Sequence, residues 1–555
     1  MKVLFITSEH PSRLYGGLGT FTREFTRTLK QYCTVVTVYF HYSQEPMPPR
    51  DEYIDYVFQP AFSFDAFNIE SRLLENAANL RSQIDPILQT YKPDIIHCND
   101  RLTFLPFRFE PNVAYSSHLL FADLLSLQGM NDIYYQEFKT ERCAISRSAI
   151  VIIYSSFVAE RIFSQYNPKV SSVVVPLGIN NKNYYAEKDP KNIHIAYFGR
   201  FENVQKGFLN FIQAVALLEK EFKEQNKVIF SLYGKGSEIP SAYLDLFENC
   251  IHLEGEALYS AYAKTDIVVM PSNYEPFGLV GLEAMASHCL LLCTEHQGMD
   301  EYAVPGKTCV TIKSDPHSIA KTIKEVVRNY NAYQDIIENG YQESLKWTWQ
   351  RSAWAHYTLF KQIHKNRLPY LQMAYNASFY KSLQQFKTTF NNSDADKVKE
   401  LLYSVLSYNI PLYKDKKVLL LTVGELENSS EGIPENWELC SVTTKNKDGL
   451  YSRLESLMYE DNTFAYVFVV GAWEWVINPE IALKELYRIV INKLYIFYLK
   501  PSKQFAWQTI QMEHSEDWNV LQNAIHYPWQ GPSYEGLDIK GLPDCYNYLI
   551  WNKEG

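Results

Sequence analysis

Two carboxylates eight residues apart, Glu275 and Glu283, flank the point where a helix is expected to begin. The segment 273–286 follows the apolar run 266–271, which predicts a strand, a loop that carries Glu275 and then the helix. The backbone N–H groups of residues 277–280 would have no partner at the helix N-terminus, and such groups favour a diphosphate. Because two carboxylates would repel that anion, we expect them to bind the hydroxyl groups of an attached sugar.

Two cations six residues apart, Arg200 and Lys206, follow the apolar run 193–198. Arginine offers a fork of donors and lysine a point charge, so the pair could straddle a diphosphate. The alternative is a pair of solvated surface cations. The region holds no convincing Asp-x-Asp motif for a metal, so we expect no metal and no cofactor, with the leaving charge neutralised by Arg200, Lys206 and the helix N-terminus.

Three further segments follow strands in the first half of the chain. They are the glycine-rich turn Gly16, Gly17 and Gly19, the pair His97 and Asp100, and the single histidine His118. A glycine-rich turn before a helix lets backbone amides approach a phosphate or a sugar oxygen, although an ordinary strand-to-helix turn would have the same composition. Either histidine could equally be a buried core residue with its hydrogen bonds satisfied.

Short β-type runs alternate with helical segments, which predicts doubly wound α/β domains with ligands at the carboxyl ends of the strands. The first series of expected strands is 3–7, 34–40, 95–97, 113–116 and 150–154, and the second is 193–198, 228–233, 251–253, 267–270, 290–293 and 309–312. A polar stretch, 180–191, separates the two series and sets a boundary near residue 185.

The segment from Glu275 to Ala286 resembles the signature of retaining glycosyltransferases of family 4 and their glycogen-synthase relatives. This resemblance implies the GT-B architecture: two tandem Rossmann-like domains, 1–185 on the acceptor side and 186–365 for the nucleotide sugar. The segment 347–360 resembles the helix that crosses back to the first domain. The implied activity is transfer of a hexose, with retention, from a nucleoside diphosphate sugar of the UDP-glucose type to a glycan, protein or small-molecule acceptor.

The resemblance also implies roles for individual residues. Glu275 and His118 would contact the donor sugar, and Arg200 and Lys206 would stabilise the departing diphosphate. The implied binding residues are Gly16, Gly17, Gly19, His97, Asp100, Gly234, Phe277, Gly278, Leu279 and Glu283, with Glu283 holding the ribose. The loop after His118, residues 119–122, departs from the family because it lacks the usual polar residue.

The remainder of the chain predicts a helical connector, 366–413, and a third Rossmann-like α/β domain, 414–555. Its strand, helix, strand order resembles class I methyltransferases, but the loop 423–430 offers a single glycine where that fold uses two or three. We therefore expect a non-catalytic domain that does not take S-adenosylmethionine and that recruits a protein partner, orders an oligomer or holds an acceptor. The alternatives are a bifunctional glycosyltransferase and methyltransferase, or a non-enzymatic scaffold derived from a transferase.

Composition limits the remaining classes. A chain of 555 residues with 46% hydrophobic residues predicts two to four globular domains. A net charge of −10 argues against a dedicated nucleic-acid binder, and no apolar run reaches the length of a membrane span. Nine cysteines without a paired spacing favour a reduced, cytoplasmic protein.

Overall fold

The computed structural model contains two compact units, one formed by residues 1–167 and 174–357 and the other by residues 168–173 and 358–555. It describes residues 1–12, 17–42, 46–48, 51–62, 69–128, 132–166, 171–181, 184, 188–189, 191–223, 228–375, 383, 392–424, 433–476, 478–499, 529–530 and 546–553. The domain boundaries expected from the sequence stay predictions.

The first sheet has the order β3-β2-β1-β4-β5-β6-β7, in which β1 to β6, all in the first unit, pair in parallel. Its strands are β1 (Lys2–Thr7), β2 (Thr34–Phe40), β3 (Tyr56–Phe58), β4 (Ile95–Cys98), β5 (Val113–Ser116), β6 (Ile150–Ile153) and β7 (Ser172–Val174). Its helices are α1 (Gly17–Leu29), α2 (Ile69–Tyr91), α3 (Arg101–Phe104), η1 (Leu105–Phe107), α4 (Phe121–Gln128), α5 (Asp132–Arg147) and α6 (Ser156–Gln165).

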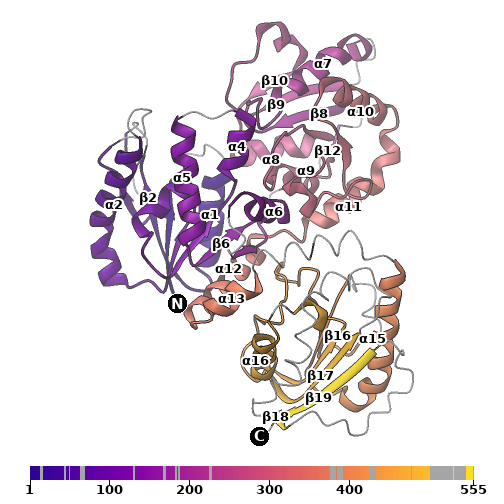
Figure 1. Ribbon diagram of the computed structural model, residues 1–555. Coiled ribbons are helices and arrows are strands. Elements are labelled where there is room, and N and C mark those ends of the chain that lie inside the picture. Colours follow the sequence, from indigo (N-terminus) through magenta and orange to yellow (C-terminus); the bar gives the residue numbers. More distant parts are fainter. Residues whose placement is uncertain are drawn as a thin grey trace. The chain divides into compact units, whose positions relative to one another are not determined.

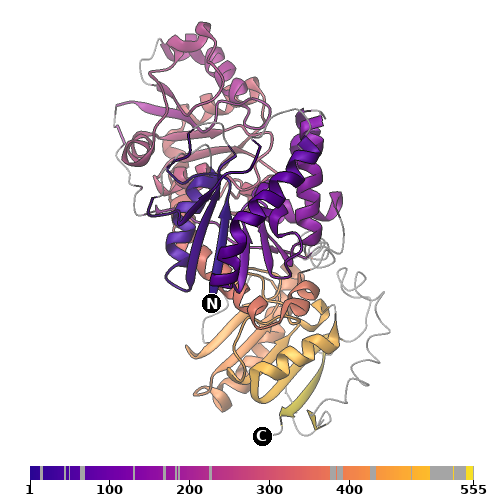
Figure 2. The same ribbon diagram turned by 90° about the vertical axis from the view of Figure 1, so that its left-hand side faces the viewer.

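Helices cover both faces of this first sheet. On one face, the ring of Phe25 in α1 packs against His97 of β4 and against His356 of the later helix α12 (Trp349–His364). Helices α2 and α5 lie on the other face (Figures 1 and 2). Strand β1 is buried from Val3 to Thr7, as a strand covered on both faces must be.

A second parallel sheet of the first unit has the order β10-β9-β8-β11-β12-β13. Its strands are β8 (Ile193–Phe198), β9 (Val228–Tyr233), β10 (Asn249–Ile251), β11 (Ile267–Met270), β12 (Leu290–Thr294) and β13 (Val310–Ile312). Its helices are α7 (Phe208–Lys223), η3 (Ser241–Leu246), α8 (Gly255–Lys264), α9 (Leu279–Ala286), η4 (Gly298–Glu301), α10 (Pro316–Arg328), η5 (Tyr330–Tyr333) and α11 (Gln334–Ser344).

The strands expected from the sequence are present in both sheets, with one correction. We expected a strand at 251–253, but β10 occupies Asn249–Ile251, because it pairs with β9 and that strand ends at Tyr233 opposite Ile251. The sequence pattern did not predict β3 and β7, two strands of three residues each at the edges of the first sheet. Runs of three residues are too short to show an alternating pattern.

The second unit holds helices in the segment expected to be a helical connector, α13 (Leu368–Ala374) and α15 (Asn392–Tyr413). A third sheet follows, in the order β15-β14-β16-β17-β19-β18. Its elements are β14 (Val418–Thr422), β15 (Trp437–Ser441), β16 (Phe464–Val470), η7 (Trp473–Trp475), α16 (Pro479–Ile489), β17 (Val490–Leu499), β18 (Trp529–Gln530) and β19 (Tyr546–Lys553). The first four strands of that order are parallel, and β19 runs antiparallel to both β17 and β18.

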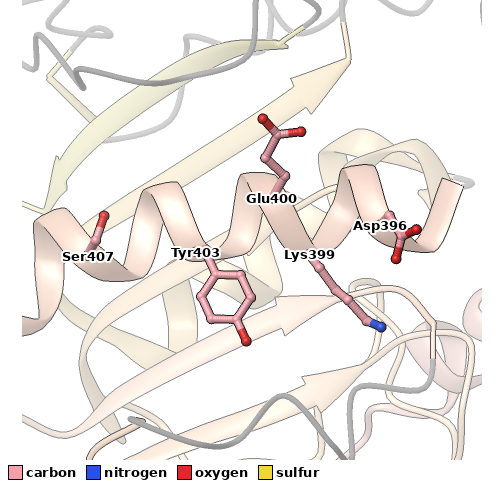
Figure 3. Close-up of a pocket in the computed structure, with 5 residues that line it drawn as sticks. All are labelled: Asp396, Lys399, Glu400, Tyr403 and Ser407. Atoms are coloured by element: carbon pink, nitrogen blue, oxygen red, sulfur yellow. The ribbon is translucent and has the colours of Figure 1, made fainter. Parts of the chain in front are cut away.

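A shallow hollow of about 540 Å³ lies along α15 in this second unit. Figure 3 shows its lining side chains on that helix, with Glu400 and Ser407 on one side and Lys399 and Tyr403 on the other. None of them was expected to be a site residue. Within the described part of the chain, no helix is long and apolar enough to cross a membrane.

Candidate active site

The Glu275 loop, defined as residues 271–278, connects β11 to α9. Its last residue, Gly278, caps α9 with a φ of 84°, a left-handed conformation that favours glycine. A β-carbon there would also lie 2.9 Å from the hydroxyl of Tyr302, which donates a hydrogen bond to the Gly278 carbonyl. The N–H of Gly281 bonds to the Gly278 carbonyl at 3.1 Å, so the amides before it lie at the open N-terminus of the helix.

The Glu275 carboxylate lies against the side chain of Lys206. Its Oε2 atom is 2.7 Å from Lys206 Nζ and 3.4 Å from the donating Oγ of Ser272. The Glu275 N–H donates to Oε1 of Gln297 at 2.9 Å, which fixes the backbone at this position. The side chains of Glu275 and Lys206 are only 9% and 19% exposed, so each charge depends on the other for compensation.

The loop after β8 carries both predicted cations. Arg200 donates to the neutral Oε1 of Gln205 at 2.6 Å, so this contact leaves its positive charge uncompensated. The Gln205 carbonyl accepts the N–H groups of Asn273 and Tyr274, at 2.8 and 3.2 Å. These bonds join the loop after β8, residues 199–207, to the Glu275 loop. They bring Arg200, Lys206 and Glu275 close together.

Glu283 lies inside α9, where its carboxylate accepts a hydrogen bond of 2.8 Å from the Tyr262 hydroxyl. Burial raises the pKa of Glu283, while hydrogen bonds from Tyr262 and Tyr184 oppose that rise. The Tyr262 ring stacks on Phe198 with centroids 3.8 Å apart, which fixes the hydroxyl. Gly234 follows β9, and its N–H bonds to the Ile251 carbonyl at 2.9 Å.

His118 follows β5 and is half-buried. Its Nε2 is 2.8 Å from Oδ1 of Asn99, while the amide nitrogen of Asn99 donates to Thr22. Because that oxygen can only accept, Nε2 carries the proton and Nδ1 is the acceptor. Burial, and next the nearby His356, lower the pKa of His118 to about 3, so the ring is neutral at pH 7.

Two other expected site residues support the fold around them. His97 is fully buried, with Nε2 2.7 Å from the Ser116 hydroxyl and its ring against Phe5. The Asp100 carboxylate caps α3, accepting the N–H groups of Leu102 and Thr103 at 2.8 and 3.2 Å. The structure does not bring these two side chains together with Glu275.

Three more of the expected residues, Phe277, Gly17 and Leu279, lie around the start of α9. Phe277 is buried, its ring packed between Tyr302 and Trp347. Gly17 opens α1, and a β-carbon there would lie 3.8 Å from the side chain of Leu279, the first residue of α9. Gly19 is buried within α1, whereas Gly16 lies outside the described residues.

Four residues that hold the site residues in position were not predicted from the sequence. They are Gln205, Tyr262, Ser272 and Gln297, which bond to Arg200, Glu283 and Glu275. Gln205 directly precedes Lys206, and Ser272 lies three residues before Glu275. This closeness in the sequence was the signal that could have identified them. Among the described residues, no group of three histidine, cysteine, aspartate or glutamate side chains could hold a metal ion.

Two family models match adjacent parts of the chain. The model for glycosyltransferase family 4 matches residues 15–182, and the model for glycosyl transferases group 1 matches residues 181–343. The junction of these matches falls between the first and second sheets.

Curated relatives and a solved structure agree with these matches. A glycogen synthase from Mycobacterium tuberculosis is 24% identical, over 60% of this chain and 88% of its own. An uncharacterized glycosyltransferase from Bacillus subtilis is 21% identical, over 66% of this chain and 99% of its own. A sucrose-phosphate synthase structure from Thermosynechococcus elongatus superposes with a TM-score of 0.57 and 17% identity, over 66% and 99% of the two chains. The first part of the chain therefore has the GT-B fold, and it is similar in sequence to glycosyltransferases of family 4 and group 1.

Proposed function

We propose that this chain transfers a hexose, with retention of anomeric configuration, from a nucleoside diphosphate sugar to a hydroxyl acceptor. The observation that carries the proposal is the contact of Lys206 with Glu275 beside the N-terminus of α9. A cation, a carboxylate and open amides in one place suit a diphosphate joined to a sugar. A UDP-glucose-type donor is the one that we propose first, and the relative named as a glycogen synthase supports a glycan as acceptor.

In this proposal the diphosphate binds the first amides of α9 together with Arg200 and Lys206. These groups neutralise the charge that develops as the sugar departs. Glu275 and the neutral ring of His118 bind sugar hydroxyls, and Glu283 binds the ribose. No step requires a metal or another cofactor in this proposal.

Retention needs an explanation, because retaining hydrolases use a carboxylate nucleophile about 5 Å from an acid. Here Glu275 is held by Lys206, so we propose that the acceptor oxygen attacks on the face from which the diphosphate leaves. The bond from the anomeric carbon to the acceptor oxygen forms as its bond to the phosphate oxygen breaks. The acceptor proton passes to that phosphate oxygen.

The third sheet belongs to a domain that we propose to be methyltransferase-like and non-catalytic. Val423 and Ala472, at the carboxyl ends of β14 and β16, are fully buried in one apolar cluster with Trp473. A nucleoside cofactor would need this crevice, where ligands of such sheets bind. This packing supports the proposal that the domain takes no S-adenosylmethionine. We propose that 414–555 instead binds a protein partner, a second copy or an acceptor chain.

We also propose a cytoplasmic location. The cysteines that the structure describes are free thiols, which supports a reducing compartment.

A donor screen tests the proposed function. Binding of nucleoside diphosphates, nucleotide sugars and S-adenosylmethionine is measured by the rise of the melting temperature, and product anomers are then identified by NMR. We expect a rise with one nucleoside diphosphate and its sugar, which Lys206→Ala abolishes and Lys264→Ala, at an exposed lysine of α8, retains. A rise with S-adenosylmethionine would support the bifunctional alternative, and no nucleotide response at all would support the scaffold.

A further inference from the structure

The Glu275 loop is hydrogen-bonded to the first-sheet half of its own unit on both sides of Glu275. Before it, the hydroxyl of Tyr274 accepts the N–H of Leu120 at 2.9 Å, in a buried contact. After it, the carbonyl of Pro276 accepts the hydroxyl of Ser155 at 2.6 Å, also buried. The partners of each bond are more than 100 residues apart, so only the folded arrangement brings them together.

Both bonds reach helix N-termini. Leu120 directly precedes α4, and Ser155 is the N-cap of α6, where its Oγ also accepts the N–H of Val158. A third contact lies at the N-terminus of α6, where the Glu301 carboxylate accepts the N–H of Ser156 at 2.6 Å. A carboxylate at that position is favoured by the helix dipole.

The two helices that receive these bonds are joined to each other. Asp123 of α4 accepts hydrogen bonds from Arg161 and Gln165 of α6, at 3.1 and 2.6 Å. The side chain of Asp123 is only 3% exposed, so the link is buried at its centre. The N-termini of α4 and α6 therefore form one support for the Glu275 loop.

We propose that the Tyr274–Leu120 and Ser155–Pro276 hydrogen bonds form an interlobe clasp that sets the position of His118 relative to Glu275. His118 lies two residues before Leu120, and Glu275 lies between Tyr274 and Pro276, so the clasp is a short path from one to the other. This inference rests on the proposed function, in which both side chains bind the same sugar. A misplacement of about 1 Å at such a site costs roughly 100-fold in rate.

Tyr274 and Ser155 are thus positioning residues, which act through Glu275 and His118. Their loss should leave the diphosphate contacts intact, because Arg200, Lys206 and the start of α9 all belong to the second-sheet half. It should lower the rate of transfer and admit water to the sugar, because closure of the two halves excludes water.

The test compares Tyr274→Phe and Ser155→Ala with the control Tyr330→Phe, whose hydroxyl bonds to the Asp266 carbonyl within the second-sheet half. With UDP and UDP-glucose as probes, we expect UDP affinity to change less than about twofold. We expect kcat for transfer to fall by about 10- to 100-fold and the fraction of donor lost to hydrolysis to rise. The control should match the unmodified chain in all three measurements.

Hydrogen exchange gives a second readout that needs no substrate. In Tyr274→Phe, the peptide that contains Leu120 should exchange faster, while peptides from β11 and β12 keep their protection. Unchanged exchange at Leu120, or an unchanged ratio of hydrolysis to transfer, would overturn the clasp. Absence of UDP binding and turnover in the unmodified chain would instead reject the proposed donor, and exchange at Leu120 would still decide whether the clasp exists.

Discussion

Lys206 Nζ lies 2.7 Å from Oε2 of Glu275, although the two residues are 69 positions apart in the chain. The contact forms because β8 and β11 are neighbours in a parallel sheet, so the loops after them meet at the same edge. One buried ion pair thus joins the side chain proposed to hold the phosphate to the one proposed to hold the sugar.

Removing either partner should lower activity more than stability. In Glu275→Gln the amide keeps the shape of the carboxylate but leaves Lys206 without its counter-charge, which should cost on the order of 2 kcal/mol of unfolding free energy. Transfer should fall by at least about 100-fold, because Glu275 is the group that we propose binds the sugar. Denaturant unfolding and initial rates measure the two effects, and near-normal turnover would reject the assigned role of Glu275.

Tyr262→Phe should weaken donor binding without slowing the chemical step. The Glu283 carboxylate, which we propose binds the ribose, would lose the 2.8 Å hydrogen bond from the Tyr262 hydroxyl. We expect the donor KM to rise by about 5- to 10-fold at unchanged kcat, the signature of lost uniform binding. A fall in kcat at constant KM would show that Tyr262 acts on the reaction itself.

His118, which we propose binds the sugar, should not titrate near neutral pH. The pKa of His118 is lowered to about 3, below its ordinary value of 6.5. Below pH 6.5 His118 is therefore protonated in the unfolded chain but stays neutral in the folded chain. The free energy of unfolding decreases as the pH falls from 6.5 towards 3. By pH 5 this histidine alone should cost on the order of 2 kcal/mol, which His118→Gln would recover. An NMR titration of its ring that shows a midpoint near 6.5 would contradict the assignment.

Glu141 should have the opposite effect on the pH dependence. Burial raises its pKa from 4.5 to about 7, despite hydrogen bonds from Tyr166 and from the N–H of Phe121. Its folded-state pKa is raised, so its stabilising contribution is complete below pH 4.5 and is lost as pH rises through about 7. The loss is on the order of 3 kcal/mol.

The matched variant for this prediction is Glu141→Gln. Its amide oxygen can still accept the N–H of Phe121, so the loop before α4 should keep its structure. The melting temperature of the variant should approach or pass that of the unmodified chain above pH 7 and fall below it near pH 4.5. Parallel melting temperatures across this range would show that Glu141 does not titrate there.

The sequence predicted the strands and the loops better than the contacts between them. Strands such as 193–198 and 267–270 are largely apolar runs that are followed directly by a glycine or a proline, so both their type and their ends could be predicted. The Lys206–Glu275 contact depends on which strands are neighbours, and the clasp depends on Tyr274 and Leu120, 154 positions apart. No pattern of neighbouring residues in the sequence predicts either of these two contacts.

His97 illustrates a second limit. A histidine after a strand has the same sequence signal whether it binds a ligand or fills the core. Only the rings of Phe5 and Phe25 around it, and its complete burial, show where it lies.

Gly298 restricts how this site can evolve. A β-carbon at this position would lie 1.7 Å from the carbonyl oxygen of Pro276, the same oxygen that binds Ser155. Every substitution would therefore push the backbone beside Glu275, and a library of random variants selected for transfer should retain glycine there. A new donor preference would therefore have to evolve through changes of the surrounding side chains, while the backbone at Gly298 and Pro276 stays the same.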